Sequence, residues 1–252
     1  MTETSTSFAA RYRVAPGKAF DLSKVDPRDS GPFKDKEEAK ARTAEHAAAI
    51  DALQDRLYAE GKRALLVVLQ GIDCSGKDGT VRAVFNPCGP IGVRVSPFKA
   101  PTADELAQDY LWRVHGACPP RGYIGIFNRS HYEDVLAVKV RNLAPAKVVE
   151  QRYDQINAFE KLLADSGTRV LKLMLHISRK EQGERLRERR AGKIGLAIES
   201  QHTFFYERDI GRPAADINDD GVLAHLAVGA DAVINLVGVL HSDPGLPYGK
   251  QF

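Results

Sequence analysis

The chain has 252 residues and the composition of an ordinary water-soluble globular protein, with 43% hydrophobic and 27% charged residues. Its apolar runs fall short of the roughly 20 residues that cross a bilayer, and residues 1–10 lack a basic patch followed by an apolar stretch, so we expect neither a membrane partner nor export. The formal net charge of +3 is too small to indicate a nucleic-acid partner.

The length fits a single α/β domain that follows an irregular segment. Residues 1–34 are predicted to form an extended N-terminal arm, because the stretch 11–36 is rich in Pro, Gly, Asp and Lys. The domain itself is expected to occupy 35–252. Three cysteines without metal-ligand spacing predict reduced thiols and a cytoplasmic protein: Cys74, Cys88 and Cys118.

From Asp35 onward, apolar residues recur at spacings of three and four, which predicts a helix that ends at Gly61. Its expected inner stripe is Ala39, Thr43, Ala47, Ile50, Leu53 and Leu57. Further helices are expected at 79–85, from a capping box at 102 to about 115, from Pro145 to Gly167, and at 179–190. The helix after Pro145 is expected to turn these residues inward: Val148, Val149, Tyr153, Ile156, Phe159, Leu162 and Leu163.

The continuous apolar run at 64–70 predicts a buried parallel strand. Further strands are expected at 93–98, 123–127 and 168–177, and the stretch 223–240 is apolar enough for a final strand and helix. Strands that alternate with helices imply a parallel sheet covered on both faces. The predicted fold class is therefore α/β, a three-layer sandwich with a parallel central sheet. Such sheets bind ligands at the carboxyl ends of their strands.

The first predicted strand runs into Gly71-Ile-Asp-Cys-Ser-Gly-Lys-Asp-Gly79, which matches G-x-x-x-x-G-K in the strand-to-helix context of a P-loop. In such a loop the backbone N–H groups converge on phosphate oxygens, and the helix N-terminus adds positive potential. Lys77 is predicted to carry its charge to a phosphate being transferred. The alternative is a glycine-rich turn without a ligand. The predicted phosphate-binding residues here are Gly71, Ser75, Gly76, Lys77, Asp78, Gly79 and Thr80.

Two carboxylates distinguish this loop from an ordinary nucleotide-binding P-loop. Asp78 stands where a Ser or Thr would ligate Mg²⁺, and Thr80 comes two residues later. Asp73 lies inside the loop, where it would repel a phosphate unless a cation lies between them. Asp73 is therefore a candidate Mg²⁺ ligand as well as a candidate catalytic residue. Its alternative role is to cap loop amides.

A second polar cluster, Asn128-Arg-Ser-His-Tyr-Glu-Asp134, follows the third predicted strand at the position of a Walker B element. Its cation, amide, hydroxyl groups and carboxylates suit phosphate contact together with metal or nucleotide positioning, whereas ordinary helix capping is the alternative. We expect Arg129 to be catalytic and Glu133 to be a second metal ligand. The expected nucleotide-side residues are Asn128, Ser130, His131, Tyr132, Glu133 and Asp134.

Four strings together resemble the polyphosphate kinase 2 family, most closely its polyphosphate:nucleotide phosphotransferase branch. They are 71–79, Phe98-Lys-Ala-Pro101, Tyr110-Leu-Trp-Arg-Val-His115 and 124–135. The stretch 12–39 is similar to the same branch, so the resemblance covers about residues 11–190. From 191 to 252 the chain diverges, since its one tryptophan, Trp112, leaves the family's later tryptophan-containing elements without a counterpart.

The resemblance implies a P-loop kinase-like fold with a helical lid at about 179–210. It also implies a reversible, Mg²⁺-dependent transfer of the terminal phosphate of inorganic polyphosphate to ADP, AMP or both, with ATP as a product and Mn²⁺ as an alternative metal. The implied assembly is a homodimer or homotetramer. Lys77 and Asp73 match the family's Walker A element. Lys99 matches its Phe-Lys element on the catalytic side of the sheet and is expected to bind phosphate. The matches to its Walker B element are Asn128, Arg129, Glu133 and Asp134.

The stretch 179–193 contains seven basic and three acidic residues. A charge run alone is typical of a solvated helix face, but beside a phosphate loop it predicts an electrostatic clamp on a polyanion, with Arg185 and Arg189 binding phosphate. Two rival functions remain. One is an ATP-dependent nucleotide or metabolite kinase, against which Asp78 argues. The other is a non-catalytic polyphosphate-binding protein with a degraded C-terminal region.

Overall fold

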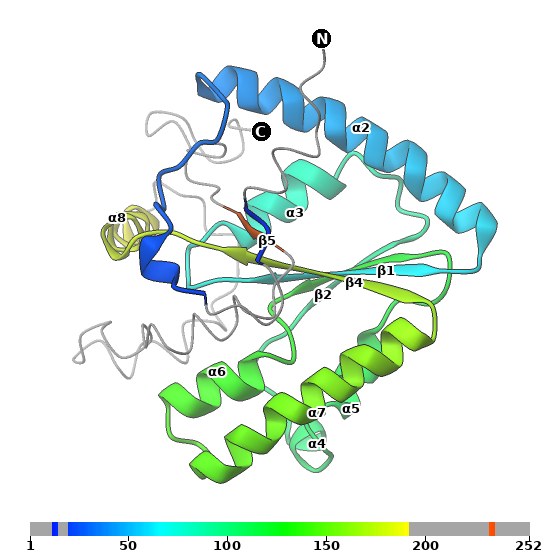
Figure 1. Ribbon diagram of the computed structural model, residues 1–252, viewed down its shortest axis with the longest axis vertical. Helices are drawn as coiled ribbons and strands as arrows, with labels where there is room; N and C mark the ends of the chain where they lie inside the picture. The colour runs from blue at the N-terminus through cyan, green and yellow to red at the C-terminus, as the bar shows by residue number, and fades with distance from the viewer. Residues whose placement is uncertain (1–11, 15–19, 192–231, 235–252) are drawn as a thin grey trace.

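The computed structural model describes residues 12–14, 20–191 and 232–234, and at its centre lies a sheet of five parallel strands. Their spatial order is β2-β3-β1-β4-β5, so β1 lies in the middle between β3 and β4 (Figure 1). The strands are β1 Ala64–Gln70, β2 Val93–Pro97, β3 Ile124–Asn128, β4 Thr168–Leu175 and β5 Ala232–Ile234. Strand β5 falls within the stretch expected to form a final strand; the helix expected there lies outside the described residues.

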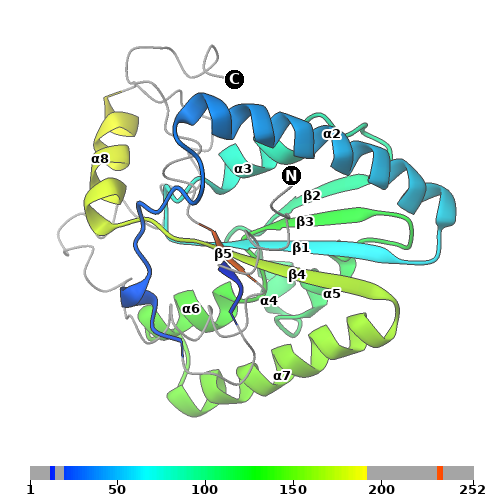
Figure 2. The same ribbon diagram turned by 45° about the horizontal axis from the view of Figure 1, so that its top comes forward.

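Helices cover both faces of the sheet, which confirms the expected α/β sandwich (Figures 1 and 2). Helices α2 and α3 lie on one face, α5, α6 and α7 lie on the other, and α8 stands beyond the carboxyl ends of the strands. Their bounds are η1 Leu22–Lys24, α2 Lys36–Glu60, α3 Lys77–Phe85, α4 Ala103–Leu106, α5 Trp112–Ala117, α6 Glu133–Val140, α7 Ala146–Asp165 and α8 Arg179–Arg190. No helix among the described residues is both long and apolar enough to span a bilayer.

The continuous apolar run of β1 is explained by burial on both faces of the sheet. Successive side chains of a strand point to opposite faces, and here Leu66 and Val68 join the core beneath α5, α6 and α7. Val67 and Leu69 join the second core beneath α2 and α3. If every second side chain of β1 were polar, one of the two helical layers would have no apolar strand surface to pack against.

Two of the expected helix faces were wrong in part. On α2, Leu53 is 60% exposed, whereas the neighbouring Gln54 is 1% exposed. Gln54 follows Ala47 by seven residues and so continues the buried stripe, and Leu53 is turned away from it by about 100°. On α7, Val148 is 37% exposed and Leu162 is 52% exposed. Each is turned by about 100° around the helix from its buried neighbour, Val149 or Leu163.

The single helix expected from 102 to about 115 was also wrong, because the chain forms α4 and α5 with a turn between them. The capping box is present, since the Thr102 and Glu105 side chains each accept from the other residue's backbone N–H. Asp109 interrupts the helix: its carboxylate accepts the Leu111 N–H at 2.9 Å and its carbonyl accepts the Trp112 N–H at 3.1 Å. Such local side-chain hydrogen bonds compete with helical ones.

The described part of the N-terminal arm packs on the domain. Val14 and Leu22 are buried in the core beneath α7, and the Tyr12 hydroxyl donates to Asp29 at 3.1 Å. Helix α2 then begins after Asp35, whose carboxylate accepts the Glu38 N–H at 2.9 Å. The division of the chain at residue 34 stays a prediction.

Strand β3 and α5 offer a matched pair of glycines for a test of packing. A Cβ at Gly125 would lie 2.8 Å from the Pro119 ring, whereas a Cβ at Gly116 meets nothing within 4 Å. We expect Gly125→Ala to destabilise the fold by about 1–3 kcal/mol through overpacking. Gly116→Ala is expected to stabilise it by about 0.4–1 kcal/mol because the unfolded chain loses freedom. Urea unfolding followed by circular dichroism measures both, and a Gly125→Ala variant as stable as the parent would contradict the packing.

Candidate functional site

The segment between β1 and α3 has the geometry of a phosphate-binding loop. At Gly71 a Cβ would lie 2.6 Å from the Leu175 carbonyl oxygen, so only glycine fits where the loop leaves the sheet. Gly76 stands at the N-cap of α3 with φ +100°, and no side-chain hydrogen bond caps this helix. The N-terminal amides of α3 are thus left for an anion, which the partial positive charge of a helix N-terminus favours.

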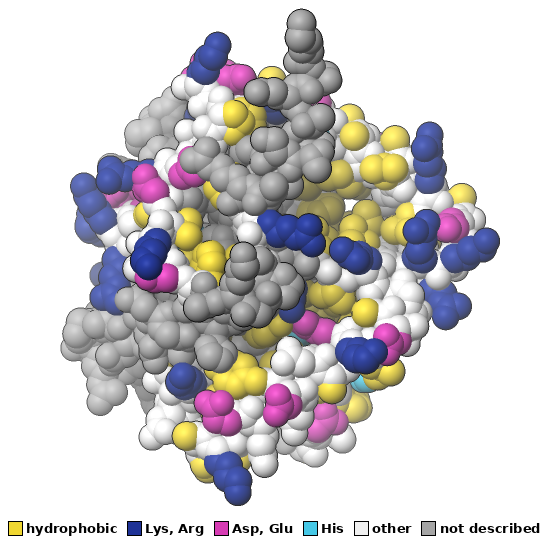
Figure 3. Space-filling view, in the orientation of Figure 1, with side chains coloured by type: hydrophobic (Ala, Val, Ile, Leu, Met, Phe, Trp, Pro, Cys, Tyr) yellow, Lys and Arg dark blue, Asp and Glu magenta, His cyan; other side chains and the backbone are white. Residues whose placement is uncertain are grey.

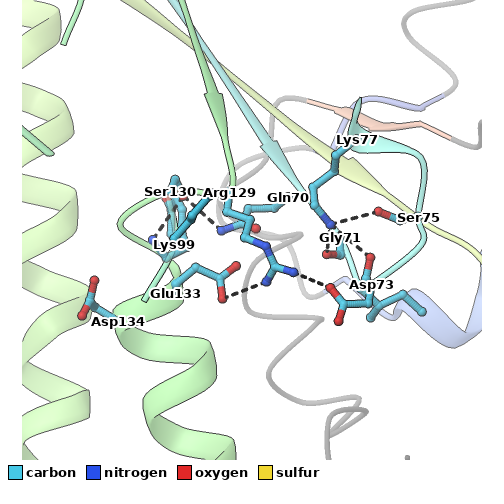
Figure 4. Close-up of polar contacts among 12 residues, drawn as sticks. Gln70, Gly71, Asp73, Ser75, Lys77, Lys99, Arg129, Ser130, Glu133 and Asp134 are labelled. Carbon is cyan, nitrogen blue, oxygen red and sulfur yellow. Dashed lines mark hydrogen bonds and ion pairs between the residues drawn. The ribbon is translucent and has the colours of Figure 1, made fainter. Parts of the chain in front are cut away.

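Lys77, the first residue of α3, lies folded against this loop (Figure 4). Its ammonium donates to the carbonyl oxygens of Gly71 at 2.8 Å and Ile72 at 3.1 Å, and lies 3.4 Å from the Ser75 hydroxyl. Its side chain is almost fully buried, and Ser75 is wholly buried. The predicted P-loop lysine is therefore at the loop, with its charge supported by neutral dipoles.

The two predicted polar clusters meet through Arg129. Its guanidinium forms an ion pair with Asp73 of the loop and lies 3.5 Å from the Glu133 carboxylate, so one cation bridges two carboxylates (Figure 4). All three side chains are only 20–25% exposed. The contact arises because β3 lies next to β1, which brings the loops after the two strands to the same edge of the sheet.

Left-handed backbone conformations mark both loops. Cys74 has φ +64° and Arg129 has φ +63°, and the third described non-glycine residue with positive φ, Asn142, lies outside the site. Such conformations cost of order 1–3 kcal/mol and persist only where the surrounding structure holds them. At Arg129 the turn redirects the chain as β3 ends.

The charges of this cluster shift two pKa values. Burial raises the pKa of Asp73, but the nearby Arg129 and Lys77 outweigh it and hold that pKa below its ordinary value. Burial and the charge of Arg129 lower the pKa of Lys77 to about 8, although Asp73, Glu133 and Asp78 act in the opposite direction. Asp73 is therefore ionised at neutral pH. Lys77 is a cation at neutral pH, and its pKa lies close to neutrality.

Other predicted phosphate-loop residues are placed as follows. The Asn128 amide donates to the Asp78 carboxylate at 2.5 Å, which joins the two loops a second time. The Thr80 hydroxyl donates to the Gly76 carbonyl at 3.0 Å, within α3. Lys99 follows Phe98, whose N–H donates to the Asn128 carbonyl at 3.0 Å, so Lys99 reaches the same edge of the sheet (Figure 4).

Ser130, His131 and Tyr132 form the buried part of the second loop. All three are buried, and Ser130 accepts from the Gln70 amide at 3.1 Å. Nε2 of His131 lies 3.2 Å from the Glu160 carboxylate, which also accepts from the Tyr132 hydroxyl at 2.8 Å. Lys172 of β4 donates to the same carboxylate at 2.6 Å. Glu160 and Lys172 carry no signal in the sequence, because their pairing depends on how α7 packs against β4.

Asp134 also turns away from the loop cluster (Figure 4). Its carboxylate lies 3.7 Å from the Arg113 guanidinium, and its carbonyl accepts from Arg152 at 2.6 Å. Burial raises the pKa of Asp134, against the opposing effect of Arg113 and Arg152. Of the residues predicted to face the nucleotide, the structure brings Asn128 and Glu133 to the loop, and the nucleotide-side role of the others stays a prediction.

Helix α8 contacts the phosphate loop directly. Nη1 of Arg185 donates to the Cys74 carbonyl at 2.9 Å, and the Gln182 amide donates to the Asp73 carbonyl at 3.2 Å. Arg189 lies near enough for its charge to help lower the pKa of Asp73. Basic side chains stand over α8 at the left of Figure 3, with acidic ones among them. The rest of the predicted lid, 192–210, lies outside the described residues.

The two predicted metal ligands have donors that suit Mg²⁺, which favours one or two carboxylates together with phosphate oxygens. Asp73 and Glu133 already share one cationic partner in Arg129, so their carboxylates lie close to a single point. Among the described residues no group of three or more His, Cys, Asp or Glu side chains could hold a metal alone. A cation here would need oxygens from a bound phosphate.

Comparisons with known proteins agree with this geometry. The family model described as polyphosphate kinase 2 matches residues 33–194. The chain is 52% identical over 180 residues to an AMP/ADP-polyphosphate phosphotransferase of Meiothermus ruber, covering 71% of this chain and 67% of that protein. It is 36% identical over 187 residues to an ADP-polyphosphate phosphotransferase of Rhodopseudomonas palustris, covering 69% and 65%. The crystal structure of polyphosphate kinase 2 from Arthrobacter aurescens TC1 superposes with a TM-score of 0.77 at 36% identity, covering 93% of this chain and 84% of that one. The sequence alignments thus span about two thirds of the length of the two relatives.

Proposed function

Because this chain belongs to the polyphosphate kinase 2 family, we propose that it transfers the terminal phosphate of inorganic polyphosphate to a nucleotide, with ADP, AMP or both as acceptors. The relatives named above carry this activity in their names. The observation in this chain that supports it best is the Asp73–Arg129–Glu133 cluster at the mouth of a phosphate loop whose helix N-terminus is uncapped.

The chemistry requires two polyanions to meet. A terminal phosphate oxygen of the nucleotide is already anionic at neutral pH, so it attacks the end phosphorus of polyphosphate without a strong general base. The terminal P–O–P bond breaks, and the polyphosphate leaves one phosphate shorter. Lys77 and Arg129 offset the repulsion and stabilise the charge that is spread over the transferred phosphoryl group. The loop amides fix the donor in line with the acceptor. A bound Mg²⁺, held by Asp73 and Glu133, would neutralise further phosphate charge, and Mn²⁺ is the alternative metal.

A coupled assay tests this function. Purified protein is mixed with Mg²⁺, long-chain polyphosphate and either ADP or AMP, without any nucleoside triphosphate, and ATP or ADP formation is followed. We expect product with at least one acceptor. An ATP-dependent kinase would be inactive in this mixture, and a non-catalytic binding protein would retain polyphosphate in a salt-sensitive way without forming product. Light scattering of the same preparation tests the proposed homodimer or homotetramer.

The pKa of Lys77 gives the proposal a pH signature. Lys77 is charged below its pKa of about 8 and neutral above it. We therefore expect kcat/KM for polyphosphate, which reports the free enzyme, to fall about tenfold per pH unit above that value. In Lys77→Arg the guanidinium stays protonated, so whatever activity remains should not show this fall. A parent profile that stays flat to pH 10 would show that deprotonation of Lys77 does not limit the reaction.

A further inference from the structure

The contacts between α8 and the phosphate loop are directed at backbone carbonyls. Gln182 and Arg185 bind the carbonyls of two consecutive loop residues, Asp73 and Cys74. Gln182 is 6% exposed, so its amide is committed to this contact. The strand that leads into α8 also passes close to the loop, because a Cβ added at Gly71 would lie 2.6 Å from the Leu175 carbonyl oxygen.

Arg185 is held by protein groups on two sides. Nε donates to the Glu181 carboxylate at 2.7 Å, and Nη1 donates to the Cys74 carbonyl. Both side chains of the Arg185–Glu181 pair are only about 15% exposed. Its guanidinium also lies 3.7 Å from where a Cβ of Gly76 would stand, so it rests against the turn before α3. Arg185 is predicted from the sequence to bind phosphate. In the structure its hydrogen-bond partners are the Cys74 carbonyl and the Glu181 carboxylate.

The direction of these carbonyls fixes the direction of loop amides. The chain has no cis peptide bonds among the described residues, and in a trans peptide the C=O and the following N–H point to opposite sides. When α8 holds the carbonyls of Asp73 and Cys74, the N–H groups of Cys74 and Ser75 are directed away from α8, and the Ser75 N–H donates within the loop to the Ile72 carbonyl at 3.1 Å. Cys74 adopts φ +64°, a conformation that a non-glycine residue leaves unless its surroundings hold it.

We propose that Gln182 and Arg185 are positioning residues that brace the backbone of the phosphate loop, and that they act on phosphoryl transfer through loop geometry rather than by binding polyphosphate. The inference rests on the proposed function for its kinetic readout. In this proposal the first turns of α8 support the phosphate loop. Arg189, whose charge helps to lower the pKa of Asp73, remains available to act on the ligand.

The sharpest test is Gln182→Met, because this substitution removes the hydrogen bond at nearly constant volume and changes no charge. We expect kcat to fall about tenfold, since a small misplacement of reacting groups has effects of this size. The KM for polyphosphate should change by less than about threefold, as for an interaction made through geometry and not through ligand binding. Gln151→Met on the exposed surface of α7 is the matched control and should leave both constants unchanged.

Arg185→Lys separates the brace from a phosphate contact. Lysine keeps the positive charge but lacks the planar fork that joins Glu181 to the Cys74 carbonyl. A brace predicts a kcat loss similar to that of Gln182→Met, with the dependence of KM on salt unchanged. If Arg185 binds polyphosphate as a charge, Arg185→Lys keeps near-parent kcat and Arg185→Gln raises KM with a weaker salt dependence. That second pattern would overturn the proposal.

Hydrogen exchange gives a readout that does not need turnover. In Gln182→Met the amides of peptides covering 71–76 should exchange about tenfold faster than in the parent protein or Gln151→Met, with the strands unchanged. Unchanged exchange in the loop would refute the brace even if the parent protein proved inactive. Activity in the parent with unchanged kcat in Gln182→Met would refute the brace and leave the proposed function standing.

Discussion

Lys77→Ala is expected to lower kcat by at least about 100-fold, the loss that follows removal of one preorganised charge from a transition state. The ammonium is buried at the loop and hydrogen-bonded to two carbonyls, so water cannot replace it in the same position. Steady-state rates with saturating polyphosphate and ADP or AMP measure the effect. The binding of polyphosphate should weaken less than the rate falls.

The matched control is Lys62→Ala, which removes an exposed lysine from the turn between α2 and β1. This variant should keep the parent rate, which shows that the change in net charge alone has no effect. Thermal unfolding of both variants checks that the fold persists. A Lys77→Ala enzyme with a near-normal rate and a parent-like melting temperature would remove the loop from the mechanism.

Arg129→Ala is expected to have a comparable or larger effect, with a loss in kcat of about 10²–10³. Two carboxylates, Asp73 and Glu133, then face each other and the incoming phosphates without their shared cation. The pKa of Asp73 should rise because its largest opposing charge is gone. Arg129→Lys should restore little, since an ammonium cannot bridge two carboxylates as a guanidinium does.

The concentration of Mg²⁺ at half-maximal rate distinguishes the two roles of this cluster. In Arg129→Ala both proposed metal ligands remain, so that concentration should not rise. In Asp73→Asn one ligand is lost, so it should rise. If Arg129→Ala instead raised the metal requirement more than Asp73→Asn, the carboxylates would not be the groups that hold the cation.

Much of the fold follows from local pattern. The runs that form β1 and β3 are apolar and buried, and the caps at Asp35 and Thr102 signal the helices that they start. What the pattern missed depended on single residues or on tertiary contact. Asp109 breaks a helix that periodicity continues, and α6, whose first turn lies in a polar stretch, is not among the helices that the sequence predicts.

The site shows the same division. Lys77, Asp73 and Arg129 stand in recognisable motifs, so the sequence could place them at strand ends. Their mutual contact depends on the order of the strands, which the sequence does not state. The carbonyl contacts of Gln182 left no sequence signal, because glutamine on a charged helix is unremarkable until the loop beneath it is known.

The central place of β1 has a consequence for biosynthesis. Its two neighbours are made later: Leu65 pairs with Ile124, and Ala64 pairs with Thr168 at the start of β4. As the ribosome extends the nascent chain, both edges of an apolar strand therefore wait unpaired, the state in which chains aggregate or recruit chaperones. The phosphate loop can adopt its folded conformation only after β4 has been translated. Truncated chains that end before β4 should therefore be insoluble and unable to bind phosphate.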